Sequence, residues 1–147
     1  MKYILNTDGG SRGNPGVAGA GAVLASEDGN ILQEASKALG TMPNNEAEYH
    51  GLLLGLEMAK KTLGKDKIKN YQIEVRMDSE LAIKQLTGEY QVKEERLQSL
   101  FMKIWNMRVE TFKNITFKHI PREQNRRADD LANLAMDESG KDSLFDK

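Results

Sequence analysis

The sequence predicts a mixed α/β domain, and three observations lead to this class. Three strand-like segments come first, and helical apolar patterns then alternate with two further strand-like segments. Glycine, asparagine and proline residues separate these segments. The length of 147 residues suits one domain with a single core. The predicted order is therefore three strands, a helix, a strand, two helices, a strand and a final helix.

The first three strands are expected at residues 2–7, 18–26 and 31–37, with a turn at residues 27–30 that makes the last two antiparallel. Residues 8–16 are expected to form a loop between the first two strands. This segment contains four glycines and a proline, which permit tight turns and a close approach of the backbone to a ligand.

The middle of the chain predicts a helix, a strand and two more helices. The first helix follows Asn45 and stops near Gly64, because its apolar residues recur at helical spacing. The strand covers residues 71–77, a short helix ends at Leu86, and a longer amphipathic helix covers residues 93–110.

The last part predicts a strand at residues 114–120, a loop and a final helix. Residues 1–137 are expected to form the single domain. Residues 138–147 mix serine, glycine and charged residues, so we expect a flexible C-terminal tail, although Leu144 and Phe145 could fold back onto the surface.

Composition excludes several classes of function. The chain has no cysteine, which rules out disulfides, thiolate zinc sites and a cysteine nucleophile. No apolar run approaches the roughly 20 residues of a membrane-spanning helix, and the first residues do not resemble a signal peptide. We therefore expect a cytoplasmic protein without a membrane partner. The net charge of -1 lacks the strong basic character of many nucleic-acid-binding domains.

Two aspartates stand at the ends of predicted strands. Asp8 and Asp78 each follow an apolar strand, and ligands of open α/β sheets bind beyond such strand ends. If the two strands are parallel neighbours, the carboxylates lie close together and need a cation. Each aspartate alone could instead form a turn, and Asp78 could cap the helix that follows it.

Two more acidic positions leave alternatives open. Glu48 shares a helix face with Leu52 and Leu56, where a carboxylate is costly unless it is paired or binds a cation. It could also complete a capping box begun by Asn45. Helical phase favours Glu48 over its neighbour Glu46. Near the start of the last helix, phase does not separate Asp129 from Asp130, and either could complement the helix dipole.

Four motifs together resemble type 1 ribonuclease H, over residues 3–135. They are DGGSRGNPG at residues 8–16, NNEAEY at 44–49, MDS at 77–79 and HIPREQNRRADDLA at 119–132. The resemblance implies a ribonuclease H-like fold, which is a five-stranded mixed sheet with helices on both faces. It also implies a compact member, similar to archaeal and some bacterial ones, because no basic helix and loop separates residue 86 from the next helix.

The resemblance assigns roles to individual residues. Asp8, Glu48, Asp78 and Asp129 match the metal-binding carboxylates of the family, which favours Asp129 over Asp130. His119 matches a loop histidine that assists proton movement or product release. The residues expected to contact substrate are Gly9, Gly10, Ser11, Arg12, Asn14, Asn44, Asn45, Ser79 and Asn125.

The implied activity is hydrolysis of the RNA strand of an RNA/DNA hybrid by a monomer. Two Mg²⁺ ions, with Mn²⁺ as a substitute, would serve a two-metal-ion mechanism that leaves 5′-phosphate and 3′-hydroxyl ends. The absent basic helix, and Glu80 in place of a glutamine common in the family, predict weak binding of the hybrid. Rival interpretations are a catalytically silent binding module and a different nuclease on the same fold.

Overall fold

A computed structural model describes residues 1–145, and it describes side chains as far as Ser139. Its strands are β1 (Lys2–Gly13), β2 (Gly16–Ser26), β3 (Ile31–Met42), β4 (Gln72–Met77) and β5 (Asn114–His119). Its helices are α1 (Asn44–Leu63), α2 (Glu80–Leu86), α3 (Glu95–Glu110) and α4 (Arg126–Phe145), with short 3-10 turns at Ile68–Asn70 and Arg122–Gln124. The predicted order of elements is confirmed.

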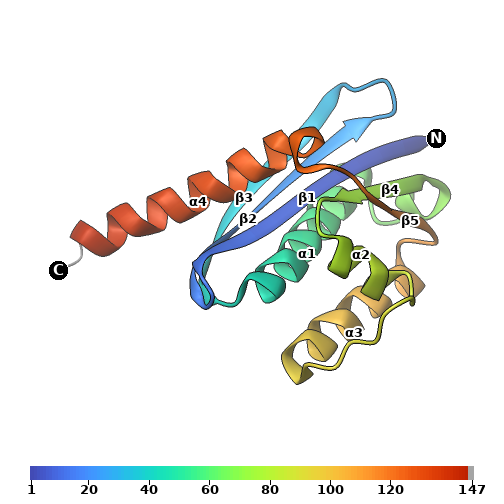
Figure 1. The fold of residues 1–147 in the computed structure, drawn as a ribbon. Helices are drawn as coiled ribbons and strands as arrows, with labels where there is room; N and C mark the ends of the chain where they lie inside the picture. Colours follow the sequence, from blue (N-terminus) through green and yellow to red (C-terminus); the bar gives the residue numbers. More distant parts are fainter. Residues whose placement is uncertain (146–147) are drawn as a thin grey trace.

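The five strands form one mixed sheet in the order β3-β2-β1-β4-β5. Strands β1, β2 and β3 pair antiparallel, whereas β4 is parallel to β1 and to β5. Helix α1 covers one face together with α2 and α3, and α4 packs against β1, β2 and β3 on the other face (Figure 1). The predicted α/β class, with helices on both faces, is therefore confirmed.

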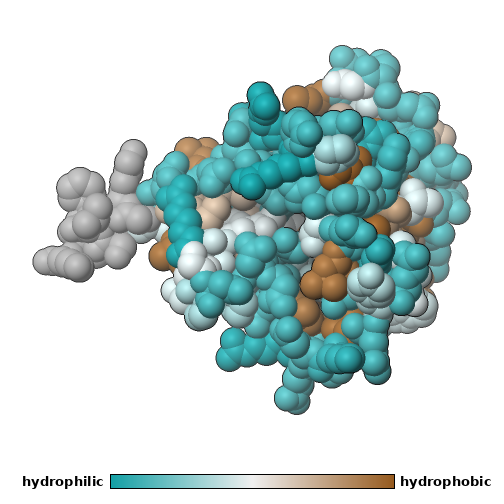
Figure 2. Space-filling view, in the orientation of Figure 1, coloured by the Kyte–Doolittle hydropathy of each residue, from teal (hydrophilic) through white to brown (hydrophobic). Residues whose placement is uncertain are grey.

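The larger part of the hydrophobic core lies between the sheet and α1. Fully buried side chains such as Leu5, Leu52 and Val75 bring together the strands and α1, and Ile104 adds α3 to the same cluster. A smaller cluster under α4 contains Val23, Ala128 and Leu131. The outer surface in the view of Figure 2 is mostly hydrophilic.

The predicted loop at residues 8–16 is wrong, because most of it belongs to strand β1. The strand continues to Gly13, and Asp8 pairs with Gly21 in β2. The glycines of this segment lie opposite small residues of β2, so the backbone ladder continues through them. Strand β3 likewise extends beyond its predicted end. Asp8 therefore lies within β1 and not at its end.

The C-terminal helix is longer than expected. Helix α4 includes residues 138–145, where the sequence predicts a flexible tail. The predicted contact of Leu144 and Phe145 with the surface lies outside the side chains that the structure describes. Among the described residues, only a connection at residues 87–94 separates α2 from α3, and it contains no further helix. No described helix is long and apolar enough to cross a membrane.

Candidate active site

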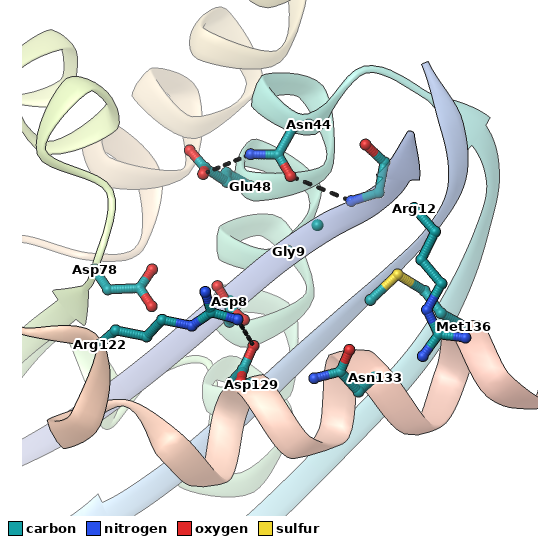
Figure 3. Close-up of a pocket in the computed structure, with 12 residues that line it drawn as sticks. Asp8, Gly9, Arg12, Asn44, Glu48, Asp78, Arg122, Asp129, Asn133 and Met136 are labelled. Atoms are coloured by element: carbon teal, nitrogen blue, oxygen red, sulfur yellow. Dashed lines mark hydrogen bonds and ion pairs between the residues drawn. The ribbon is translucent and has the colours of Figure 1, made fainter. Parts of the chain in front are cut away.

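The acidic residues singled out in the sequence line one pocket of about 420 Å³ (Figure 3). They are Asp8, Glu48, Asp78 and Asp129. The pocket lies where β1 and β4 separate, because the last parallel pair of these strands is Asn6 with Arg76. Beyond that pair the edge of β1 has no strand beside it on this side. Carboxylates from four different elements can therefore reach the same space.

Helix α1 rests directly on the backbone of β1 at this point. A Cβ atom added to Gly9 would lie 1.8 Å from the Ala47 carbonyl oxygen, and one added to Gly51 would lie 2.4 Å from that of Asp8. Only glycine fits at these two positions, because the atoms that it would meet are backbone atoms. This contact brings Glu48, the residue after Ala47, to the open edge of β1.

Helix α4 makes a similar approach on the opposite face of the sheet. Gly21 pairs with Asp8, and a Cβ atom on Gly21 would lie 2.2 Å from the Ala128 carbonyl oxygen. The backbone N–H of Asp129 donates to the carbonyl oxygen of Asn125 at 3.1 Å. The close packing at Gly21 and this first-turn hydrogen bond hold Asp129 beside Asp8.

Asn125 has a different role from the predicted one. Its side chain is only 1% exposed, and its Nδ2 donates to the Thr7 carbonyl oxygen at 2.9 Å. Its Oδ1 accepts from Nδ2 of Asn6 at 3.0 Å. The prediction that Asn125 contacts substrate is therefore wrong, because the carboxamide is buried and already bonded to β1. It joins the start of α4 to the strand that carries Asp8.

The carboxylates repel one another in a partly buried space. Burial, followed by the charge of Asp78, raises the pKa of Asp8 to about 8. Burial raises the pKa of Glu48 to about 6, although hydrogen bonds from Ser79 and Asn44 oppose this rise. Burial also raises the pKa of Asp78, and the nearby Arg122 guanidinium opposes it. The site therefore holds more negative charge than its own groups neutralise.

A hard cation fits this donor set. All four groups offer carboxylate oxygens, which Mg²⁺ and Mn²⁺ prefer. The nearest protein cation, Nη2 of Arg122, lies 3.6 Å from Oδ1 of Asp129 and is largely exposed. Among the described residues, no three acidic or histidine side chains already converge on one point. The cation site is therefore indicated by the carboxylate oxygens and their negative charge. It is not indicated by side chains that already surround one point.

Asn44 connects the β1–β2 hairpin to the Glu48 carboxylate of α1. Its Oδ1 accepts from the backbone N–H of Ser11 at 3.2 Å, and its Nδ2 donates to Oε1 of Glu48 at 3.2 Å (Figure 3). Oδ1 of Asn14 accepts from the backbone N–H of Asn44 at 3.1 Å. These bonds orient Glu48 and hold the hairpin against the start of α1.

The predicted substrate residues fall into two adjoining pockets. The main pocket includes Gly9, Gly10, Ser11, Arg12 and Asn44. A second pocket, of about 470 Å³, shares Asn44 and Glu48 with the first and adds Asn14, Asn45 and Ser79. The Ser79 hydroxyl also caps α2 by accepting from the backbone N–H of Ala82 at 3.1 Å.

His119 lies next to the site without lining either pocket. It is the last residue of β5, it is exposed, and it pairs with Met77, the residue before Asp78. The pairing of β4 and β5 therefore places His119 beside the residue that precedes Asp78, and the predicted role of His119 stays a prediction.

Three residues of the main pocket were not predicted. They are Arg122, Asn133 and Met136. Asn133 and Met136 follow Asp129 by four and seven residues, so the helical phase of α4 could have found them. Helical phase could not have identified Arg122, because it belongs to a short 3-10 turn whose position depends on the whole fold.

Comparisons with known proteins agree with this architecture. The family model described as "Reverse transcriptase-like" matches residues 6–135. The bifunctional protein Rv2228c of Mycobacterium tuberculosis is 40% identical over 147 residues, which is 99% of this chain and 38% of that protein. The ribonuclease HI of Halobacterium salinarum is 41% identical over 132 residues, covering 90% of this chain and 63% of that protein.

A solved structure gives a similar result over nearly its whole length. The crystal structure of LC11-RNase H1 in complex with an RNA/DNA hybrid has a TM-score of 0.90 and 46% identity to this chain. The match covers 93% of this chain and 98% of that one. By contrast, the chain spans only about two fifths of the mycobacterial relative.

Proposed function

Because this chain belongs to the type 1 ribonuclease H family, we propose that it is an endonuclease that hydrolyses the RNA strand of RNA/DNA hybrids. The observation that carries the proposal is the meeting of four carboxylates from β1, α1, α4 and the end of β4 in one open pocket. All four come from one chain, so we propose that a monomer is active. A cytoplasmic location stays a prediction.

The carboxylates would hold two divalent ions, Mg²⁺ or Mn²⁺. Asp8, Glu48, Asp78 and Asp129 would hold these ions through their carboxylate oxygens. Such ions, when bound, activate the attacking water and stabilise the charge that develops on the phosphate and the leaving oxygen. Water attack at phosphorus with departure of the 3′ oxygen leaves 5′-phosphate and 3′-hydroxyl ends.

The protein's own groups position the carboxylates and the substrate. Asn44 holds Glu48 through its Nδ2 donor at 3.2 Å. Burial, followed by the charge of Asp78, raises the pKa of Asp8 to about 8, so near neutral pH a cation that binds there would displace its proton. We propose that His119, exposed at the end of β5, moves a proton or assists product release.

Selection of RNA on the cut strand would depend on contacts with the 2′-hydroxyl, because that group distinguishes ribose from deoxyribose. Asn14, Asn44 and Asn45 offer carboxamides that can both donate and accept, and they lie around the second pocket. The backbone of Gly9 and Gly10 lines the main pocket without a side chain in the way.

The proposal is tested with a labelled RNA/DNA hybrid over a range of Mg²⁺ and Mn²⁺ concentrations. We expect cleavage of the RNA strand alone, with 5′-phosphate products. Asp8→Asn and Asp78→Asn should each abolish cleavage, because each removes a carboxylate from the proposed ion site. Product ends are identified by their susceptibility to a 5′-phosphate-dependent exonuclease.

Duplex RNA, duplex DNA and single-stranded RNA serve as control substrates. Absence of cleavage by the wild-type protein at every ion concentration would refute the enzymatic function. Equal cutting of duplex DNA would instead refute the preference for hybrids.

A further inference from the structure

The main pocket continues as a groove between β1 and α4, with its carboxylates at one end and Arg12 at the other (Figure 3). Along β1, the four residue-to-residue steps from Asp8 to Arg12 span about 13 Å. Along α4, the eight steps from Asp129 to Asp137 span about 12 Å. The strand and the helix therefore flank the same length of groove, and Asn133 lines it between the two ends.

Two arginines line this groove, and each is paired with an aspartate of α4. Nη2 of Arg12 lies 2.5 Å from Oδ1 of Asp137, and Nη2 of Arg122 lies 3.6 Å from Oδ1 of Asp129. Among the described residues, no other lysine or arginine lines the groove. In this state, Nη2 of each guanidinium faces an aspartate, which would compete with a phosphate for it.

A nucleic-acid strand brings a negative charge at every nucleotide. At the carboxylate end, bound cations would offset both the protein's charge and the phosphate's charge. At the other end, the lining residues Arg12, Asn133 and Met136 include no metal-binding carboxylate. Among the lining residues at this end, Arg12 is the only cation for a phosphate, and a bidentate contact that uses its Nη2 would replace Asp137.

The Arg12–Asp137 pair is suited to such an exchange. The two side chains are 48% and 54% exposed, and exposed ion pairs are weak because water screens them. A bidentate contact between guanidinium and phosphate is at least as favourable in geometry as one with a carboxylate. The pair can therefore hold Arg12 at the groove without preventing the exchange.

We propose that Asp137 is an internal competitor of the substrate: it holds Arg12 when no substrate is bound and is replaced by a backbone phosphate of the hybrid. This inference rests on the proposed function and adds a residue that controls how tightly the hybrid is held. Asp137 acts through Arg12 and is a positioning residue, since it touches no reacting atom.

The test is Asp137→Asn, with hybrid binding measured by fluorescence anisotropy in EDTA at several salt concentrations. The variant should bind about 2- to 5-fold more tightly, which corresponds to the loss of one exposed ion pair. The slope of log Kd against log salt should change by less than about 0.9, the value for one phosphate contact, because Arg12 contacts the same phosphate in both complexes. In Mg²⁺, KM should fall in proportion while kcat stays unchanged.

Glu138→Gln is the matched control. It removes the same charge from the next residue of α4, whose exposed side chain forms no ion pair among the described residues. Its affinity should stay within about 1.5-fold of wild type, because water and salt screen an exposed charge. A general effect of charge on α4 would change both variants alike.

Arg12→Gln completes a double-mutant cycle. It should weaken binding by itself, and the gain from Asp137→Asn should disappear in the Arg12→Gln background. The inference is overturned if Asp137→Asn binds no more tightly than Glu138→Gln, if it binds more weakly, if the gain persists without Arg12, or if the wild-type protein does not bind hybrid at all. Binding that follows the cycle without any cleavage in Mg²⁺ or Mn²⁺ would refute the proposed enzymatic function and leave this inference standing.

Discussion

The two ends of the groove differ in how they are held. At the carboxylate end, the backbones of α1 and α4 touch the sheet at Gly9, Gly51 and Gly21, where not even a methyl group fits. At the Arg12 end, one exposed ion pair with Asp137 joins β1 to α4. A site for chemistry must keep charges together against their repulsion, whereas a site for binding gains from contacts that can exchange.

The ends also differ in electrostatics. Burial and mutual repulsion raise the pKa of Asp8, Glu48 and Asp78, so the carboxylate end stores unfavourable charge until a cation arrives. The Arg12 end is already balanced by its own aspartate. The carboxylates at one end therefore attract cations strongly. Arg12 at the other end attracts phosphate only modestly, because Asp137 offsets its charge. This contrast agrees with the weak hybrid binding that the sequence predicts.

The largest expected effect separates two adjacent aspartates of α4. Asp129→Asn should lower hybrid cleavage at least about 100-fold, because it removes a carboxylate from the proposed ion site. Asp130→Asn should keep most of the activity, since Asp130 is exposed and does not line the pocket. Steady-state cleavage in Mg²⁺ measures both. Equal losses in the two variants would contradict the assignment of Asp129.

An intermediate effect is expected at the contact between α1 and β1. Gly51→Ala places a Cβ atom 2.4 Å from the Asp8 carbonyl oxygen, which neither backbone can easily avoid. We expect a loss of about 1–3 kcal/mol in the free energy of unfolding, despite the better helix propensity of alanine. Urea denaturation measures this loss, and kcat should fall as well because Glu48 moves relative to Asp8.

Gly10→Ala is the matched control for stability. A Cβ atom at Gly10 would lie 3.5 Å from Oδ1 of Asn44, which is an ordinary contact. This variant should unfold at nearly the same urea concentration as the wild type. If Gly51→Ala proves equally stable, the close backbone packing does not hold the carboxylate end together.

The smallest expected effect is a dependence of stability on pH in the metal-free protein. The pKa of Asp8 rises from 3.8 to about 8 on folding, so the folded chain binds more protons than the unfolded chain between these values. Stability should therefore be greatest below about pH 4 for this group and should decline as pH rises toward 8. Asp8→Asn should remove much of this decline and raise Tm at pH 8.

Thermal unfolding in EDTA from pH 5 to pH 9 measures this dependence. Asp130→Asn provides a control with the same loss of charge at an exposed position. Added Mg²⁺ should raise Tm of the wild type at pH 8 more than that of Asp8→Asn, because the cation relieves the same repulsion. A wild-type Tm that is independent of pH would contradict the raised pKa of Asp8.

Local patterns were enough for the order of strands and helices and for several site residues. Helical phase favoured Glu48, which lines the pocket, over Glu46, which is buried and has Oε1 3.7 Å from Nη1 of Arg96. Asp78 follows the last residue of β4 as expected. The predicted order of elements was confirmed because apolar periodicity depends on residues close in the chain.

Other predictions failed where distant residues decide the structure. The glycine-rich segment was read as a loop, yet pairing with β2 extends β1 to Gly13. Asn125 was assigned to the substrate, yet Thr7 and Asn6, more than a hundred residues away in the chain, bind its carboxamide. Neither partner can be recognised from the local sequence.

The sequence by itself determined the elements and the chemical character of the site, because each residue type brings its own functional group: carboxylates can bind cations, carboxamides donate and accept hydrogen bonds, and glycine has no side chain. Only the tertiary structure decided how these groups meet. It showed that Gly9, Gly51 and Gly21 serve close packing between backbones, and that Arg12 is paired with Asp137. Contacts between residues far apart in the chain require the sheet order and the helix positions, which are settled only when the whole core is buried.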